Sequence, residues 1–323
     1  MATPPAPPSG LRLGVSACLL GDEVRFDGGH KLDHFLVDTL ARFVEFVPVC
    51  PEVGIGLGVP RETLRLVEIG GATRLVGNKT GTDLTERMQA FSARTVRELE
   101  ALDLSGYVLK KDSPSCGFER VRLYRPETGI PARTAVGLFA AALMAAFPLL
   151  PVEEEGRLRD HRLRENFIER IFSYRRVRDL LHGRWTVGSL VAFHARAKLQ
   201  VLAHDPTAYR ALGQLVAGGK ALARAELAER YAALYLGALS RPATVKRHVN
   251  VLQHMAGYFK KQLDPAAREE LHGLIDDFAA GQAPLIVPLT LLRHHSRSHH
   301  VDYLIGQFYL EPSPRELMLR NHV

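Results

Sequence analysis

Short apolar runs alternate with amphipathic segments along the first half of the chain. Runs rich in β-branched residues predict strands at residues 11–17, 46–50 and 107–109, and two alternating runs joined by Gly70-Gly71 predict a hairpin at 65–76. Apolar positions at helical spacing predict helices at residues 33–43, 83–102 and 135–147. Strands that alternate with helices indicate an α/β sandwich with a mainly parallel sheet, a Rossmann-like arrangement.

The second half is helical in pattern almost throughout. Six segments predict helices, at Arg162–Leu181, Val187–Leu202, Ala208–Gly218, Ala221–Leu239, Arg241–Leu263 and Pro265–Ala280. Residues 285–289 are ambiguous, and a further helix is predicted at about 297–310. We therefore expect an all-α domain behind the α/β domain. The expected boundaries are 10–152 and 153–323, with Pro151–Gly156 as a linker or helix start.

Charge supports the division into two domains, which the length of 323 residues also favours. The net charge is +7; residues 1–150 contain 17 Lys/Arg and 17 Asp/Glu, whereas residues 151–323 contain 25 and 18. A solvated basic surface explains this excess best, and an anionic partner such as RNA stays open. The Pro/Ala-rich N-terminus does not resemble a signal peptide, and no apolar run is long enough to cross a bilayer. A cytoplasmic protein is expected.

Three single cysteines, Cys18, Cys50 and Cys116, each follow a short apolar run. The carboxyl ends of parallel strands meet at one edge of a sheet, so the fold could bring the thiols together. Three thiolates leave one position open at a tetrahedral metal or at an iron–sulfur cluster, which a catalytic centre needs and a structural one does not. The alternative is three unrelated buried cysteines, because free Cys is among the most buried residue types.

Other polar residues near the cysteines could perform acid–base chemistry. Glu52 lies two residues after Cys50, and Ser113 lies three before Cys116. A carboxylate there could move protons, and a hydroxyl could hold a substrate heteroatom. The alternatives are a surface carboxylate and a turn-forming hydroxyl. Arg61 and Asp112 add charge nearby.

Several motifs of the first half resemble the thiouracil desulfidase family. They are Ser16-Ala17-Cys18-Leu19-Leu20-Gly21, Val24-Arg25-Phe26-Asp27-Gly28-Gly29-His30-Lys31, Cys50-Pro51-Glu52 with Gly56-Leu57, Pro60-Arg61, and Lys111-Asp112-Ser113-Pro114-Ser115-Cys116-Gly117. The second half resembles the YbgA-type domain that is often fused behind this family, through residues 165–172, 246–254 and Arg320-Asn321. The C-terminal motifs identify a domain without identifying its activity.

The resemblance implies a [4Fe–4S] cluster bound by Cys18, Cys50 and Cys116. The fourth iron would take the sulfur of a small thiolated pyrimidine, and the family reaction converts thiouracil to uracil with release of hydrogen sulfide and no net redox change. An acidic residue and a serine assist in the family. By motif position these are Glu52 and Ser113, with Ser115 as the second candidate for the hydroxyl. Ser115, Arg61 and Asp112 are the expected substrate-binding residues.

Two other functions remain open from the residues. Three thiols with a histidine such as His30 could form a structural or regulatory zinc site. A basic second half could instead direct the first half to thiolated bases in RNA, although one tryptophan and no recognisable RNA-binding motif make nucleic acid the less favoured partner. His295 and His299 have a chelating i,i+4 spacing, but a polar surface segment is the favoured interpretation.

Overall fold

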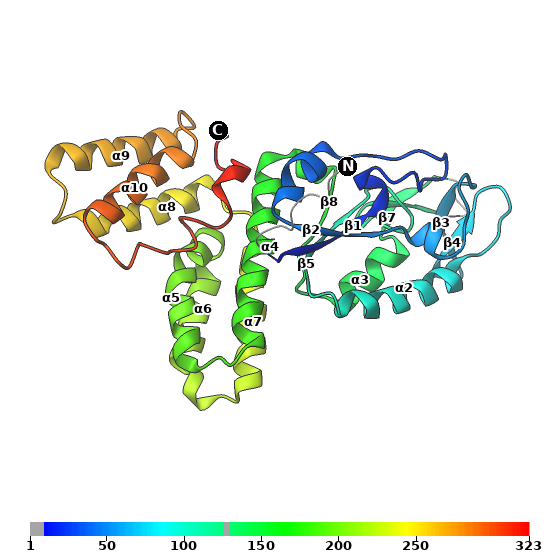
Figure 1. Ribbon diagram of the computed structural model, residues 1–323, viewed down its shortest axis with the longest axis horizontal. Helices are drawn as coiled ribbons and strands as arrows, with labels where there is room; N and C mark the ends of the chain where they lie inside the picture. Colours follow the sequence, from blue (N-terminus) through cyan, green and yellow to red (C-terminus); the bar gives the residue numbers. More distant parts are fainter. Residues whose placement is uncertain (1–9, 126–129, 323) are drawn as a thin grey trace. The chain divides into compact units, whose positions relative to one another are not determined.

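The computed structural model describes residues 10–125 and 130–322. The chain divides between Arg159 and Asp160 into two compact units, coloured blue to green and green to red in Figure 1. We call them the α/β unit and the helical unit. The expected boundary at 152/153 lies within a strand of the first unit, Val152–Glu154, a few residues before this division.

A four-stranded parallel sheet forms the centre of the α/β unit. Its strands are β1 (Arg12–Ser16), β2 (Glu45–Val49), β5 (Leu104–Leu109) and β8 (Val152–Glu154), in the order β2-β1-β5-β8. The register pairs Ser16 with Val49 and Val15 with Val108, so the carboxyl ends of β1, β2 and β5 lie at one edge. This confirms the α/β class with a parallel sheet.

A second, mixed sheet lies in the same unit. It contains β3 (Leu64–Ile69), β4 (Ala72–Gly77), β6 (Val121–Tyr124) and β7 (Ala132–Ala135), in the order β4-β3-β6-β7. The predicted hairpin is confirmed as β3 and β4, which pair antiparallel. Strands β6 and β7 were not predicted, because four residues are too few to establish a period of two.

Two helices, α2 (Thr85–Glu100) and α3 (Leu138–Ala146), pack side by side against the central sheet (Figure 1). Phe139 of α3 meets the ring of Tyr107 edge-on, with 6.0 Å between centroids. The Tyr107 ring in turn covers Gly14, where a Cβ would lie 2.1 Å from ring carbons, so only glycine fits there. The helix predicted at 33–43 is instead a short π-helical turn, Phe35–Thr39, followed by a 3₁₀ turn, Leu40–Arg42.

The predicted linker at 151–156 is wrong. Residues 152–155 are buried, and Glu153, Glu154 and Glu155 each have a partner. Arg157 Nε donates to Glu153 Oε1 at 2.6 Å, and the amide of Phe118 donates to Glu154 Oε1 at 3.1 Å. Glu155 pairs with Lys110. Three consecutive glutamates suggest an exposed segment, because carboxylates are buried only where hydrogen bonds compensate their lost hydration.

The helical unit contains seven α-helices among its described residues. They are α4 (His161–His182), α5 (Val187–His204), α6 (Pro206–Ala217), α7 (Arg224–Leu239), α8 (Val245–Ala256), α9 (Pro265–Ala279) and α10 (Ile286–Ser298). Side chains of Asp160, Thr186, Asp205, Thr244 and Asp264 cap the N-termini of five of them. No described residue of the unit is in a strand, which confirms the all-helical class.

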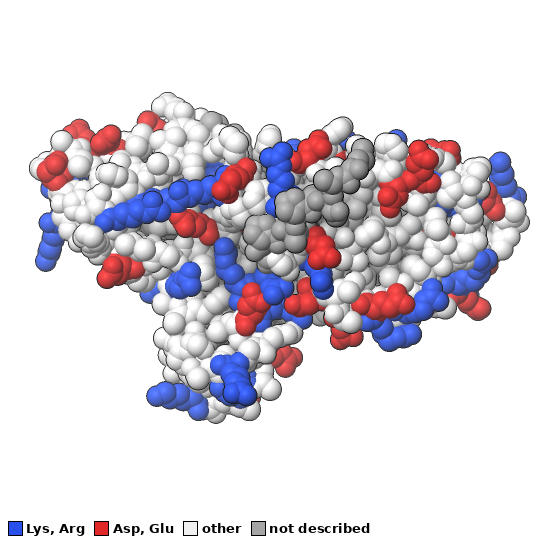
Figure 2. Space-filling view, viewed as in Figure 1, with Lys and Arg blue, Asp and Glu red and all other residues white. Residues whose placement is uncertain are grey.

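The end of the chain differs from the prediction. The ambiguous segment 285–289 belongs largely to α10, and the helix predicted at 297–310 is a series of turns after α10 ends at Ser298. His300 adopts a φ of 51°, in the left-handed region, which ends helical propagation. No described helix combines the length and the apolarity needed to cross a membrane. On the face in Figure 2, Lys and Arg side chains gather in a band over part of the helical unit, whereas both signs of charge alternate over the α/β unit.

Truncation tests the position of the boundary. We expect residues 10–159 to fold alone and to unfold cooperatively on heating, because that fragment keeps β8 and the partners of its glutamates. Residues 10–151 should lose this transition or aggregate, since β5 then has an unpaired edge and Phe118 loses the acceptor for its buried amide. Circular dichroism with heating measures both. Equal unfolding midpoints would contradict the role given to β8.

Candidate active site

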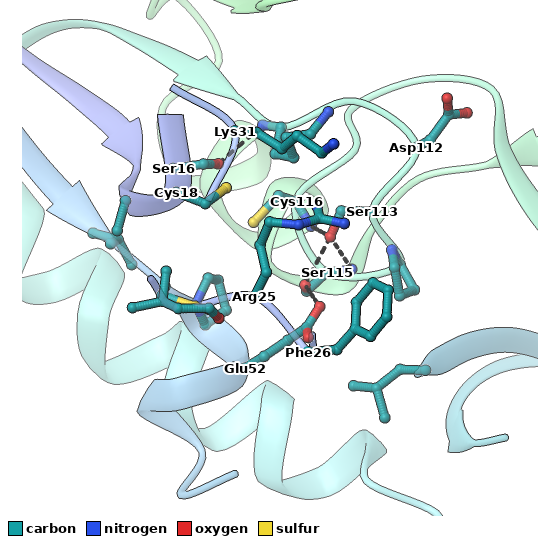
Figure 3. Close-up of a pocket in the computed structure, with 18 of the residues that line it drawn as sticks. Ser16, Cys18, Arg25, Phe26, Lys31, Glu52, Asp112, Ser113, Ser115 and Cys116 are labelled. Carbon is teal, nitrogen blue, oxygen red and sulfur yellow. Dashed lines mark hydrogen bonds between the residues drawn. The ribbon is translucent and has the colours of Figure 1, made fainter. Parts of the chain in front are cut away.

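A cavity of about 380 Å³ lies where β1, β2 and β5 end (Figure 3). Every site residue that the sequence analysis named lines it: Cys18, Cys50, Glu52, Arg61, Asp112, Ser113, Ser115 and Cys116. These residues span about a hundred positions of sequence, so only the fold brings them together. The parallel register of the three strands is the direct cause.

The three cysteines reach the cavity from three strand ends. Cys18 lies in the 3₁₀ turn Ala17–Leu20 after β1, Cys50 caps the short helix α1 (Pro51–Gly54) after β2, and Cys116 lies in the loop after β5. Burial raises the pKa of Cys18 to about 11 and that of Cys116 to about 12, and it also raises the pKa of Cys50. Charge on Cys18 or Cys50 would raise the pKa of Cys116 further, so the thiols lie within electrostatic reach of one another.

A thiolate-bound iron–sulfur cluster fits these residues. The donors are three soft sulfur ligands. The charges of Lys110 and Arg25 counteract part of the rise that burial causes in the pKa of Cys18, and they would offset the negative charge of bound thiolates. The hydroxyl of Tyr107, on β5, is buried without a hydrogen-bond partner, and its pKa is raised first by burial and then by Cys116 and Cys50. A buried hydroxyl without an acceptor is unfavourable, and the influence of Cys116 and Cys50 on its pKa shows that it lies near the thiols.

A single zinc ion fits these residues less well. Among the described residues, no three His, Cys, Asp or Glu side chains are close enough together to hold one metal ion. A cluster spreads its cysteine ligands over different iron atoms, so it needs no such close convergence. His30 does not line the cavity; it is exposed, and its Nδ1 accepts a hydrogen bond from the Leu32 amide at 3.2 Å.

A hydrogen-bonded chain connects Glu52 to the cysteine loop. Ser115 Oγ donates to Glu52 Oε1 at 2.9 Å, and Ser113 Oγ lies 3.0 Å from Ser115 Oγ. The Ser115 proton is directed at the carboxylate, so Ser113 is the donor of the second bond. Ser113 also accepts from the Cys116 amide at 3.1 Å, which holds the loop in place. Ser115 is 1% exposed and Ser113 is half-buried, so Ser113 is the hydroxyl with access to a ligand.

Arg61 has a different environment from the one expected of a substrate-binding residue. Its Nε and Nη2 donate to Glu52 Oε2 at 3.0 and 2.8 Å, and Nη2 also donates to the Val24 carbonyl at 2.9 Å. The Arg61 side chain is 7% exposed and that of Glu52 15%. The guanidinium is therefore occupied in holding the carboxylate, and its geometry suits positioning of Glu52.

Asp112 lines the cavity but points away from the cysteines (Figure 3). Its Oδ1 accepts from Arg133 Nη1 at 2.9 Å, and about half of each side chain is exposed. An exposed ion pair of this kind contributes little to stability. Asp112 thus lies at the rim of the cavity and takes no part in the hydrogen-bonded chain of Glu52, Ser115 and Ser113.

Sequence reasoning did not single out several side chains of the cavity wall. Arg25 packs over the ring of Phe26 with 5.2 Å between its Cζ and the ring centroid, and Lys31 lies at the opposite side of the cysteines in Figure 3. Ser16 accepts from the Lys110 amide at 2.9 Å, which ties the ends of β1 and β5 together. Arg25, Phe26 and Lys31 belong to the family motif at residues 24–31, which could have indicated a role in the site. The position of this loop relative to the cysteines cannot be predicted from sequence, because no helix or strand is predicted there.

The Glu52–Arg61 pair can be tested by unfolding in urea. Arg61→Met should destabilise the protein by about 3–5 kcal/mol, because it leaves a carboxylate that is mostly buried without its cation. Arg133→Met is the matched control, since it breaks the exposed pair with Asp112 and should cost less than about 1 kcal/mol. The double variant Glu52→Gln/Arg61→Met should recover part of the loss. Equal losses for the two arginine variants would contradict the assignment.

Comparison with known proteins finds similar proteins for both halves of the chain. A model of the 2-thiouracil desulfurase family matches residues 13–155, and a model described as protein of unknown function (DUF1722) matches residues 198–314. The uncharacterized protein YbgA of Escherichia coli (strain K12) is 34% identical over 161 residues, which are 50% of this chain and 95% of YbgA. The uncharacterized protein YbbK of Bacillus subtilis (strain 168) is 31% identical over 108 residues, 32% of this chain and 71% of YbbK.

A solved structure is also similar, that of the [4Fe-4S]-dependent thiouracil desulfidase TudS. It is 28% identical and covers 46% of this chain and 94% of its own, with a TM-score of 0.37, which is too low to show a common fold. The family models and the curated relatives carry the assignment. The chain belongs to the 2-thiouracil desulfurase family through its N-terminal domain, joined to a C-terminal DUF1722 domain in a homologue of YbgA.

Proposed function

We propose that this protein is a thiouracil desulfidase that uses a [4Fe–4S] cluster held by Cys18, Cys50 and Cys116. The observation that carries the proposal is that three thiols from three parallel strand ends face one cavity beside the Glu52–Ser115–Ser113 chain. The family description, 2-thiouracil desulfurase, supports a thiolated pyrimidine as the substrate. The cavity volume of about 380 Å³ is within the range of small-molecule sites.

The net reaction replaces sulfur by oxygen. One water adds its oxygen to the ring carbon of the C=S group, the carbon–sulfur bond breaks, and the sulfur leaves as hydrogen sulfide with both protons of the water. No electrons are gained or lost overall. When bound, the cluster supplies a Lewis-acidic iron without a protein ligand for the soft sulfur of the substrate.

The residues of the chain then have distinct tasks. Glu52 accepts a proton from the attacking water. Its Oε1 is connected to the cavity by the hydrogen bonds through Ser115 and Ser113. Arg61 fixes the other oxygen, Oε2, so that the carboxylate keeps one orientation. Ser113, the more accessible hydroxyl, donates its proton to Ser115 and can therefore orient the pyrimidine ring only as an acceptor, from a ring N–H. Arg61 is in this proposal a positioning residue, and Asp112 a residue of the rim.

Metal analysis tests the ligand set. Anaerobically purified protein should contain about four iron and four sulfide per chain and absorb broadly in the visible blue. Cys18→Ser, Cys50→Ser and Cys116→Ser should each lose most of the iron and the absorbance, because a hydroxyl replaces a soft thiolate ligand. Asp112→Asn, at the rim, is the control that should retain both.

Two results would contradict this ligand set. A cysteine variant with full iron content would remove that residue from the ligands. Wild-type protein that binds one zinc and no iron, even after anaerobic reconstitution, would replace the cluster by a structural metal site.

Kinetics test the role of Glu52. Glu52→Gln keeps one side-chain oxygen, which can accept from Arg61, but the amide nitrogen that replaces the other oxygen cannot accept from Ser115. The amide also no longer takes up a proton, so kcat for sulfide release from 2-thiouracil should fall about tenfold or more. Iron content and absorbance should stay at the wild-type level, which separates a loss of chemistry from a loss of cluster. Asp112→Asn serves again as the control for removal of one carboxylate. If kcat of Glu52→Gln equals that of the wild type, Glu52 is a structural partner of Arg61 only.

A further inference from the structure

The helical unit contains a second cavity, of about 480 Å³, that the proposed desulfuration does not use. Four arginines, Arg293, Arg297, Arg315 and Arg320, line it. The other polar residues of its wall are Thr290, His294, Ser298, Ser313 and Asn321 and two carboxylates, Glu165 and Glu169. All of these residues belong to the unit from Asp160 onward. A cavity with four guanidinium groups is uncommon, because like charges repel one another when they are brought together.

The arginines come from three parts of the chain. Arg293 and Arg297 lie one turn apart on α10 and therefore share a helix face. Arg315 belongs to the 3₁₀ turn Arg315–Leu317, and Arg320 to the C-terminal segment. The four arginines therefore meet because the chain folds back on α10, and not because they are neighbours on one helix.

Carboxylates compensate only part of this charge. Arg320 is buried and lies 3.0 Å from Glu165 and 3.9 Å from Glu169, so its charge is balanced. A single carboxylate, Glu311, serves two arginines: it pairs with Arg315 and lies 3.5 Å from Arg297 Nη2. One negative charge therefore faces two positive ones.

Arg293 has the least compensation of the four. Its Nη2 donates to the Leu310 carbonyl, while its Nε is buried without a hydrogen-bond partner. The pKa of Arg293 is lowered to about 10, first by burial and then by the charges of Arg315 and Arg320, and Glu311 offsets only part of this. Three further arginines thus surround Arg293, and a bound anion would relieve the repulsion between them and provide an acceptor for Arg293.

We propose that this cavity is a binding site for a phosphorylated small molecule of nucleotide size, with its phosphate held by Arg293, Arg297 and Arg315. Guanidinium groups bind phosphate oxygens through paired, charge-assisted hydrogen bonds, and they do so most tightly where the site is partly desolvated. The remaining walls suit an organic group, since Ile286, Pro312, Pro314, Met318 and Leu319 line the same cavity.

The shape of the site favours a single small ligand over a nucleic acid. A polyanion is bound by basic groups spread along several phosphates. Here the arginines converge on one cavity of about 480 Å³, a size typical of small-molecule sites. The inference concerns the helical unit alone and does not depend on the desulfuration chemistry.

Isothermal titration of the full-length protein with defined probes tests the site. Uridine monophosphate and phenyl phosphate should bind, inorganic phosphate should bind more weakly, and uridine should not bind. Arg297→Gln and Arg315→Gln should each weaken uridine monophosphate binding about tenfold or more, as expected for loss of a charge-assisted contact. Both side chains are exposed for more than half of their surface, so these variants should fold as the wild type does.

Arg210→Gln is the matched control, because it removes the same charge from an exposed position of α6 outside the cavity. It should leave the affinity unchanged. The proposal fails if none of the phosphate probes binds, if uridine binds as tightly as its monophosphate, or if both cavity variants keep the wild-type affinity. It also fails if only an RNA oligonucleotide binds, with a steep dependence on salt, since that result assigns the arginines to nucleic-acid docking.

Discussion

The parallel hydrogen-bond ladder between β2, β1 and β5 is the constraint on which the candidate active site depends. It aligns three strands so that all of them end at one edge, and each end is followed by a cysteine. Cys18, Cys50 and Cys116 are separated by 32 and 66 positions of sequence, so no local motif brings them together. An antiparallel strand in the middle would send one thiol to the opposite edge. The convergence of ligands is thus a property of strand direction more than of any local motif.

Paired buried charges hold this edge together. Glu155 beside Lys110 and Glu153 beside Arg157 anchor the end of β8, while the Phe118 amide binds Glu154 just after the cysteine loop. Burial still raises the pKa of Glu154 to about 7, so the arrangement has an energetic cost that its hydrogen bond only partly offsets. Buried ionic groups with full sets of partners specify geometry more than they add stability. A site that must hold several ligands and a carboxylate in register benefits from that specificity.

The helical unit also contains buried charge pairs, but some of its arginines lack a carboxylate of their own. Glu169 lies 3.3 Å from His204 and 3.9 Å from Arg320 in the interior, so the charges there are mutually satisfied. Next to this interior network, Arg297 and Arg315 share the carboxylate of Glu311, while Arg293 Nη2 donates to the Leu310 carbonyl. The contrast matters, because a structural arginine cluster would be expected to have a carboxylate for each cation. The excess of basic residues seen in the sequence of this half is therefore not only a solvated surface; part of it surrounds a cavity.

The sequence by itself determined the two fold classes, the strands that precede the three cysteines and eight of the residues that line the cavity, because apolar periodicity and chemically distinctive residue types are local properties. It did not determine that Arg61 is bound to Glu52, that Asp112 pairs with Arg133, or that three consecutive glutamates are buried, because partners distant in sequence decide each of these. The same holds for the arginine cavity, whose four cations look like ordinary surface residues along the chain. Only the tertiary structure showed which charges are balanced, since compensation is a matter of distances between side chains that lie far apart in the sequence.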